Sequence, residues 1–195
     1  MKKLPIGIQT FSSVIEGDFV YIDKTPMVAQ MLEGAGRYFL SRPRRFGKSL
    51  LLDTIKSIFE GRKALFEGLY LESRWDWQKS WPVIQIDLAN AGVHSLDMLD
   101  DWLHQQLDEN QQALNLDVEH HTNPAIRFTR LIQEAAKQSQ QQQVVILIDE
   151  YDKPILDNIE HLEQATAVRE VLKSFYSVIK GQDLRYPHKN SFGNR

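Results

Sequence analysis

The chain has 195 residues, of which 42% are hydrophobic, and this length predicts one domain with a single substantial core. Its formal net charge of -3 gives the whole molecule no electrostatic bias toward nucleic acid or an anionic membrane, so a polyanion site must be local. The lack of cysteine excludes disulfides and thiolate metal sites and fits a reducing compartment. Because no apolar stretch approaches about 18 residues and no secretory signal stands at the N-terminus, we expect a cytoplasmic protein without a membrane partner.

The first half of the chain predicts a helix, a strand, a basic loop and a second helix. The first helix begins at Thr25-Pro26, where a capping hydroxyl precedes proline, and ends near Gly34. The apolar run 37–41 is bounded by glycine and proline, which predicts a buried strand. From Lys48 onward apolar residues recur at helical spacing and stop before Gly61, which predicts a helix directly after the basic loop.

The second half alternates predicted strands and helices. Residues 81–90 and 144–149 read as strands, and both carry acidic residues near their C-terminal ends. Helices are predicted from a Ser95 cap through Leu114, from Asn123-Pro124, and over the apolar positions 165–179 with Gly181 as the stop. This order predicts an α/β protein with a mainly parallel sheet covered by helices on both faces. Ligands of such sheets bind at the C-terminal ends of the strands.

The loop "RPRRFGKS" ends as a phosphate-binding loop ends. Gly47 permits close approach of the backbone to an anion, Lys48 is able to bridge the terminal phosphates, and Ser49 is able to ligate Mg²⁺. The full pattern G-x-x-x-x-G-K-[ST] lacks its first glycine here, because Arg42 stands in that place. The alternative is a basic turn ahead of a helix.

Cations are concentrated in this loop, where Arg42, Arg44, Arg45 and Lys48 lie within seven residues. One or both of Arg44 and Arg45 would contact the phosphates or stabilise the transition-state charge in cis, and we assign a catalytic role to Arg45. A solvated loop or a contact with nucleic-acid phosphate is the alternative. Pro43 stiffens the entrance of the loop. The predicted nucleotide-binding segment therefore comprises Arg42, Pro43, Arg44, Arg45, Phe46, Gly47, Lys48, Ser49 and Leu50.

The acidic cluster after the strand 144–149 supplies the second half of the predicted site. Asp149 would hold Mg²⁺ through water, and Glu150 would orient and deprotonate the attacking water. The alternative is that these acids cap the next turn, and Asp152 either supports the pair or caps the following segment. Both features occur in the expected order, so we expect Lys48 and Asp149 to lie side by side with a magnesium-chelated polyphosphate between them.

Two further groups of residues are candidates for ligand sites. The adjacent His120-His121 lack the acid-histidine spacing of a zinc site, so we interpret them as surface residues. Three tryptophans, Trp75, Trp77 and Trp81, are able to stack nucleic-acid bases. Packing ahead of a buried strand is the alternative that we favour for them.

Six segments together resemble a known family. They are "LPIGIQTF", "FVYIDKT", "FLSRPRRFGKSLLLD", "LFEGLYL", "WPVIQIDLA" and "VVILIDEYDKPI". They are similar to the predicted AAA-ATPase-like family of bacterial proteins, in which a P-loop ATPase domain is often followed by a PD-(D/E)XK nuclease-like domain. The resemblance implies a P-loop NTPase-like, three-layer α/β/α fold with ATP and Mg²⁺ as ligands.

The resemblance also assigns residues. It implies that Lys48 and Ser49 contact the phosphates and Mg²⁺, and that Asp149 and Glu150 form the metal-binding and water-activating pair. An arginine at the start of the loop is then a family trait. Tyr21, Asp23 and Lys24 match the segment "YIDKT", which the resemblance places at the nucleotide pocket.

The C-terminal end departs from the family pattern. The family would continue into an apolar strand that carries a residue sensing the γ-phosphate, whereas residues 185–195 are polar and show no strand pattern. We therefore expect an ATPase-like domain over 1–184, a sheet that is incomplete at the C-terminus, and an atypical tail over 185–195. This departure leaves ATP hydrolysis open beside Mg-dependent ATP binding.

Three functions remain as hypotheses at this point. The first is an ATP-binding, ATPase-like domain, and the second is a nucleotide-dependent switch or adaptor with little turnover. The third is a nucleic-acid-binding module that uses the arginine loop, which the acidic net charge does not support. A protein partner or self-association is left open.

Overall fold

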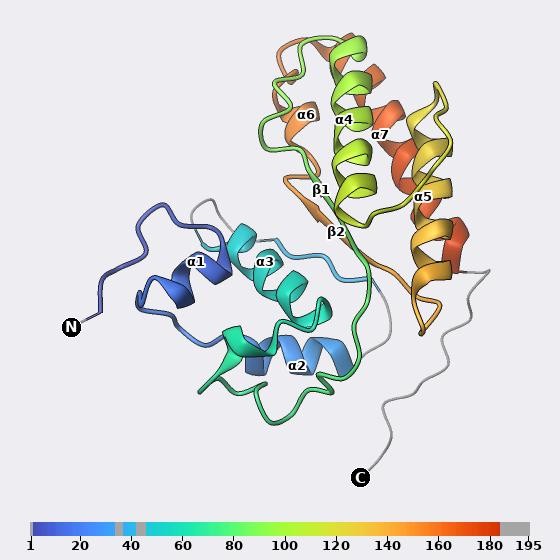
Figure 1. Cartoon of the computed structure of the whole chain (residues 1–195). Coiled ribbons are helices and arrows are strands. Elements are labelled where there is room, and N and C mark those ends of the chain that lie inside the picture. Colours follow the sequence, from blue (N-terminus) through green and yellow to red (C-terminus); the bar gives the residue numbers. More distant parts are fainter. Residues whose placement is uncertain (1, 34–36, 42–45, 184–195) are drawn as a thin grey trace. The chain divides into compact units, whose positions relative to one another are not determined.

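The structure, a computed structural model, describes residues 2–33, 37–41 and 46–183 (Figure 1). The chain divides after Trp81 into two compact units, and each is described by itself. None of the helices in the described ranges combines the length and apolar composition that crossing a membrane requires.

The N-terminal unit is built from short helices. Its elements are α1 (Phe11–Glu16), α2 (Thr25–Glu33), α3 (Lys48–Phe59) and the 3-10 helix η1 (Lys63–Phe66). The predicted helices at 25 and 48 are confirmed, whereas α1 and η1 were not predicted, because six and four residues are too few for a periodic apolar pattern to show. Helix α1 packs on α3 and η1, and the buried apolar side chains are Phe11, Val14, Val28, Leu51, Ile55, Ile58, Leu65, Phe66 and Leu71.

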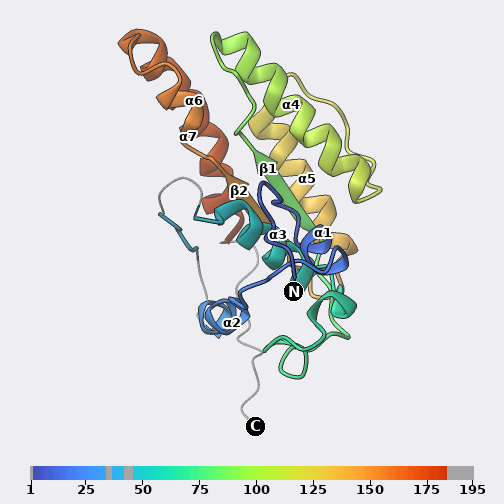
Figure 2. The same ribbon diagram turned by 90° about the vertical axis from the view of Figure 1, so that its left-hand side faces the viewer.

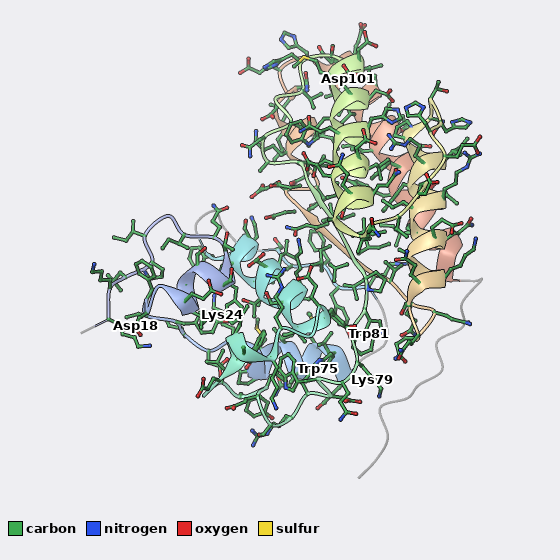
Figure 3. The ribbon with its side chains drawn as sticks, viewed as in Figure 1. Asp18, Lys24, Trp75, Lys79, Trp81 and Asp101 are labelled. Atoms are coloured by element: carbon green, nitrogen blue, oxygen red, sulfur yellow. The ribbon has the colours of Figure 1, made fainter. Side chains whose placement is uncertain are left out.

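A cluster of aromatic rings packs within the N-terminal unit. Phe59 contacts both Trp75 and Trp81, at ring-centroid distances of 5.6 and 5.4 Å, and Trp77 lies 4.9 Å from Phe66. Figure 3 labels Trp75 and Trp81 in this cluster. The tryptophans therefore pack against other rings of the same unit, which is the alternative we favoured over base stacking.

The described residues of the second unit form a parallel pair of strands and four helices. They are β1 (Val83–Asp87), α4 (Leu96–Ala113), α5 (Pro124–Gln138), β2 (Val145–Asp149), α6 (Lys153–Leu156) and α7 (Leu162–Asp183). The strands pair in register from Val83 opposite Val145 to Asp87 opposite Asp149. Figure 1 shows α4 and α5 side by side, and Figure 2 shows the two strands running next to each other. The predicted α/β class with a parallel sheet is confirmed.

Helix ends in the second unit follow the predicted caps, with one exception. The N–H of Met98 donates to Oγ of Ser95, and the N–H of Ala125 donates to Oδ1 of Asn123. The predicted stop at Gly181 is wrong, because α7 continues to Asp183 and Gly181 does not adopt the left-handed φ that ends helices.

One continuous core stabilises the second unit. Strand β1 contributes Ile84 and Ile86, and Leu88 follows directly after it. The helices contribute chiefly Leu99, Leu103, Leu107, Phe128, Leu131, Ile132, Val168, Leu172 and Phe175. The rings of Phe128 on α5 and Phe175 on α7 stack with centroids 4.6 Å apart. Burial of these side chains at about 1.5–3 kcal/mol each holds the helices on the strands.

Side chains of α4 make hydrogen bonds to the backbone of β1. Oδ1 of Asn110 accepts from the N–H of Gln85 at 2.8 Å, and Nδ2 of Asn110 donates to the carbonyl of Gln85 at 2.7 Å. Gln106 accepts from the N–H of Asp87, and Nε1 of Trp102 donates to the carbonyl of Asp87. The backbone N–H and carbonyl groups of Gln85 and Asp87 thus have partners from α4.

The predicted strand at 37–41 is wrong. Residues 37–41 have no regular secondary structure, and the one sheet in the described ranges consists of β1 and β2. Phe39, which was expected to be buried, is 68% exposed. An apolar run becomes a strand only when a neighbouring strand supplies hydrogen bonds, and local sequence does not report that pairing.

Candidate functional site

The start of α3 carries the first half of the candidate site. Gly47 is the N-cap residue, with φ 74° and ψ 30°, and no side chain caps the helix there. The left-handed φ explains why glycine stands at this position, since other L-residues adopt it at a cost. Lys48 and Ser49 form the first turn, and the carbonyl of Gly47 accepts from the N–H of Leu51 at 3.0 Å.

This helix start has the chemistry of an anion site. The first N–H groups of a helix lack partners within the helix, and the aligned peptide dipoles place partial positive charge there. An ammonium at Lys48 and a hydroxyl at Ser49 add a cation and a metal ligand to those N–H groups. Mg²⁺ commonly keeps several waters and takes only one or two protein oxygens plus phosphate, so these residues fit a magnesium-bound polyphosphate.

The predicted loop residues lie partly inside and partly outside the described ranges. Arg42, Pro43, Arg44 and Arg45 lie outside the described residues. Phe46 is 63% exposed. Leu50 lies in the first two turns of α3, and its carbonyl accepts from Oγ1 of Thr54 at 2.8 Å.

The segment "YIDKT" is fixed within the same unit. The two oxygens of the Asp23 carboxylate accept from the N–H groups of Thr25 and Tyr70, each at 2.8 Å. Asp23 thus holds the start of α2. Oη of Tyr21 lies 3.5 Å from Oγ1 of Thr54, which links the segment to α3. Burial raises the pKa of the Tyr21 hydroxyl above its usual value, so Tyr21 is a neutral group at physiological pH.

Asp149 and Glu150 lie at the C-terminal end of β2 in the second unit. Asp149 is only 7% exposed, and its Oδ1 accepts from the N–H of Glu150 at 3.0 Å. Opposite Asp149 in the register lies Asp87, whose Oδ1 accepts from the N–H of Ala89 at 2.7 Å. In-register residues of parallel strands share a face, so Asp87 adds a second carboxylate beside Asp149. Sequence reasoning noted this acid at a strand end but did not assign it to the site.

The turn after β2 has an unusual backbone. Glu150 adopts φ 49°, in the left-handed region. Oη of Tyr176 donates to the carbonyl of Tyr151 at 3.0 Å, and burial raises the pKa of Tyr176 well above its usual value, so this donor keeps its proton. Asp152 precedes α6 without a side-chain capping bond, so the capping alternative for Asp152 is wrong.

The described residues show no cluster of three or more acidic, histidine or cysteine side chains arranged for a metal ion. His120 stacks on His104 with ring centroids 5.5 Å apart, and Nδ1 of His121 accepts from the N–H of Asn123.

The predicted site residues belong to separate units. Gly47, Lys48 and Ser49 lie in the N-terminal unit, and Asp149 and Glu150 lie in the second unit.

Comparison with protein-family models identifies the family of this chain. The model of a family described as predicted AAA-ATPase matches residues 5–186. An uncharacterized protein in the vnfD 5' region of Azotobacter chroococcum mcd 1 is 46% identical over 183 residues, which is 93% of this chain and 35% of that protein. The chain therefore spans about a third of that relative's length. No solved structure matches.

Proposed function

Because this chain belongs to the predicted AAA-ATPase family, we propose that it binds ATP with Mg²⁺ and that Lys48 contacts the terminal phosphates. Ser49 and Asp149 would hold the ion, Ser49 directly and Asp149 through water. Bound Mg²⁺ would neutralise charge that develops on the phosphates.

The conformation of Gly47 carries this proposal. A left-handed glycine directly before a 12-residue helix, without a side-chain cap, leaves the helix start open to an anion rather than to a capping side chain. The next two residues supply the ammonium and the hydroxyl that magnesium-bound phosphates require. A basic helix start without ligand would more commonly carry a capping Ser, Thr, Asp or Asn.

Hydrolysis would use the acidic turn of the second unit. The Glu150 carboxylate would accept a proton from the attacking water, and its position directly after the buried Asp149 fits that role. Arg45 would stabilise charge on the transferred phosphoryl group.

Calorimetric titration of the purified protein with ATP, with and without Mg²⁺, tests the binding proposal. We expect Lys48→Ala to weaken binding about ten- to a hundredfold, since a charge-assisted contact is lost. Asp149→Asn should abolish the effect of Mg²⁺ and leave metal-free binding in place. Lys63→Ala is the matched control, because Lys63 is an exposed lysine of the same unit at the start of η1. Unchanged affinity in Lys48→Ala, or no binding below millimolar Kd in the wild type, would contradict the proposal.

Phosphate release separates an ATPase from a nucleotide-dependent switch. Turnover of ATP that exceeds about one per minute and is lost in Glu150→Gln would establish hydrolysis. This threshold lies far below the rate of ordinary enzymes, which is near ten per second. Binding without Glu150-dependent turnover would favour the switch.

A further inference from the structure

A second lysine lies at the start of α3. A Cβ atom on residue 47 would lie 3.4 Å from Nζ of Lys24, so the ammonium of Lys24 is next to the Gly47 backbone. Lys24 comes from the segment between α1 and α2, and Figure 3 labels it. Both residues belong to the N-terminal unit, so this contact is internal to one compact unit.

The backbone of Lys24 is held in place. Its carbonyl accepts from the N–H groups of Met27 and Val28 at 3.1 and 3.2 Å, which joins it to the first turn of α2. On the N-terminal side of Lys24, the carboxylate of Asp23 accepts from two backbone N–H groups, and the hydroxyl of Tyr21 reaches Thr54 of α3. The ammonium therefore approaches Gly47 from a segment that is braced against the same helix.

The electrostatics of this position call for an anion. Within the described ranges, Nζ of Lys24 makes no hydrogen bond and no ion pair. The carboxylate of the adjacent Asp23 is already engaged with backbone N–H groups. The ammonium instead lies at the positive end of a 12-residue helix whose first residue is another lysine. The ammonium of Lys24 adds positive charge at this helix start, and an anion bound there would be attracted by it.

We propose that Lys24 is a second phosphate-binding lysine, which contacts the polyphosphate of the nucleotide beside Gly47. This assignment rests on the proposed function and names which part of the ligand is recognised. Two ammonium groups at one helix start favour a ligand with several phosphate charges, so nucleoside triphosphates and inorganic tripolyphosphate bind and monophosphates bind weakly.

Titration of the full chain with ATP, AMP and inorganic tripolyphosphate tests the role of Lys24. Lys24→Met keeps most of the aliphatic stem and removes the charge. We expect it to weaken ATP and tripolyphosphate binding about ten- to a hundredfold and AMP binding much less, since one charge-assisted contact is lost. Lys24→Arg should restore most of the affinity. Lys63→Met, an exposed lysine of the same unit, should leave all three affinities unchanged.

The outcomes separate this proposal from the proposed function. If the wild type binds ATP, Lys48→Ala weakens it and Lys24→Met does not, the role of Lys24 is wrong and nucleotide binding stands. If Lys24→Met lowers the denaturation midpoint and weakens AMP and ATP equally, Lys24 has only a structural role and the proposal is overturned. If the wild type binds neither ATP nor tripolyphosphate, both proposals fail.

Discussion

Glu150 combines an acidic side chain with a backbone conformation that an L-residue adopts at a cost. Its φ of 49° lies in the left-handed region, where contact between Cβ and the backbone costs about 1–2 kcal/mol. The N–H of Glu150 donates to the carboxylate of Asp149, which helps to hold the turn. Strain of this kind commonly persists at functional positions, and a glycine would relieve it.

Two substitutions of Glu150 test whether its left-handed backbone conformation lowers the stability of the protein. We expect Glu150→Gly to be about 1 kcal/mol more stable to urea than Glu150→Ala, because both lack the carboxylate and only alanine retains the Cβ. The difference between the two midpoints of unfolding measures the strain. Equal midpoints would mean that the turn accommodates a Cβ without strain, and neither variant should hydrolyse ATP.

At the scale of elements, the contact between α4 and β1 explains how a two-stranded sheet is stabilised. A parallel strand has unpaired backbone groups along any edge that lacks a neighbour, and each buried unpaired group costs about 1–3 kcal/mol. The buried Asn110 satisfies the N–H and the carbonyl of Gln85 together, and it also donates to the carbonyl of Gln106. One amide side chain thus replaces a part of the missing neighbouring strand.

Removal of that amide should destabilise the second unit. We expect Asn110→Ala to lower the free energy of unfolding by about 1–3 kcal/mol, since buried backbone groups of β1 lose their partners. Gln105→Ala is the control, because Gln105 is an exposed residue of the same helix, and we expect a change within about 0.5 kcal/mol. Urea unfolding followed by circular dichroism measures both. A similar small effect in both variants would show that water replaces Asn110 at this edge.

The sequence predicted those elements whose signals are local. Ser95 and Asn123 predicted the starts of α4 and α5 because capping is decided by adjacent residues. The predicted strand at 37–41 failed because a strand depends on a neighbour that is distant in sequence. Short elements such as α1 escaped prediction, and the position of Lys24 beside Gly47 also depends on tertiary packing. For the candidate site, the roles of Gly47 and Lys48 come from the motif alone and stay predictions.

At the scale of the whole molecule, the residues that we propose for the ligand come from two compact units. Gly47, Lys48 and Ser49 belong to the first unit, whereas Asp149 and Glu150 belong to the second. In the proposed function, the residues of the first unit supply ammonium and hydroxyl groups, and those of the second unit supply carboxylates. If one nucleotide contacts residues of both units, as the proposed function requires, its binding energy stabilises both units.

Hydrogen exchange in the presence of MgATP tests this linkage. We expect slower exchange both at the start of α3 and over residues 149–153, because a ligand at a hundred times its Kd stabilises the groups it contacts by about 2.7 kcal/mol. Asp149→Asn should keep the protection at α3 and lose it over 149–153, whereas Lys48→Ala should lose both. Protection confined to the first unit in the wild type would contradict a site shared with Asp149. It would leave Lys48 and Lys24 as the residues of a phosphate site that does not involve the acidic turn.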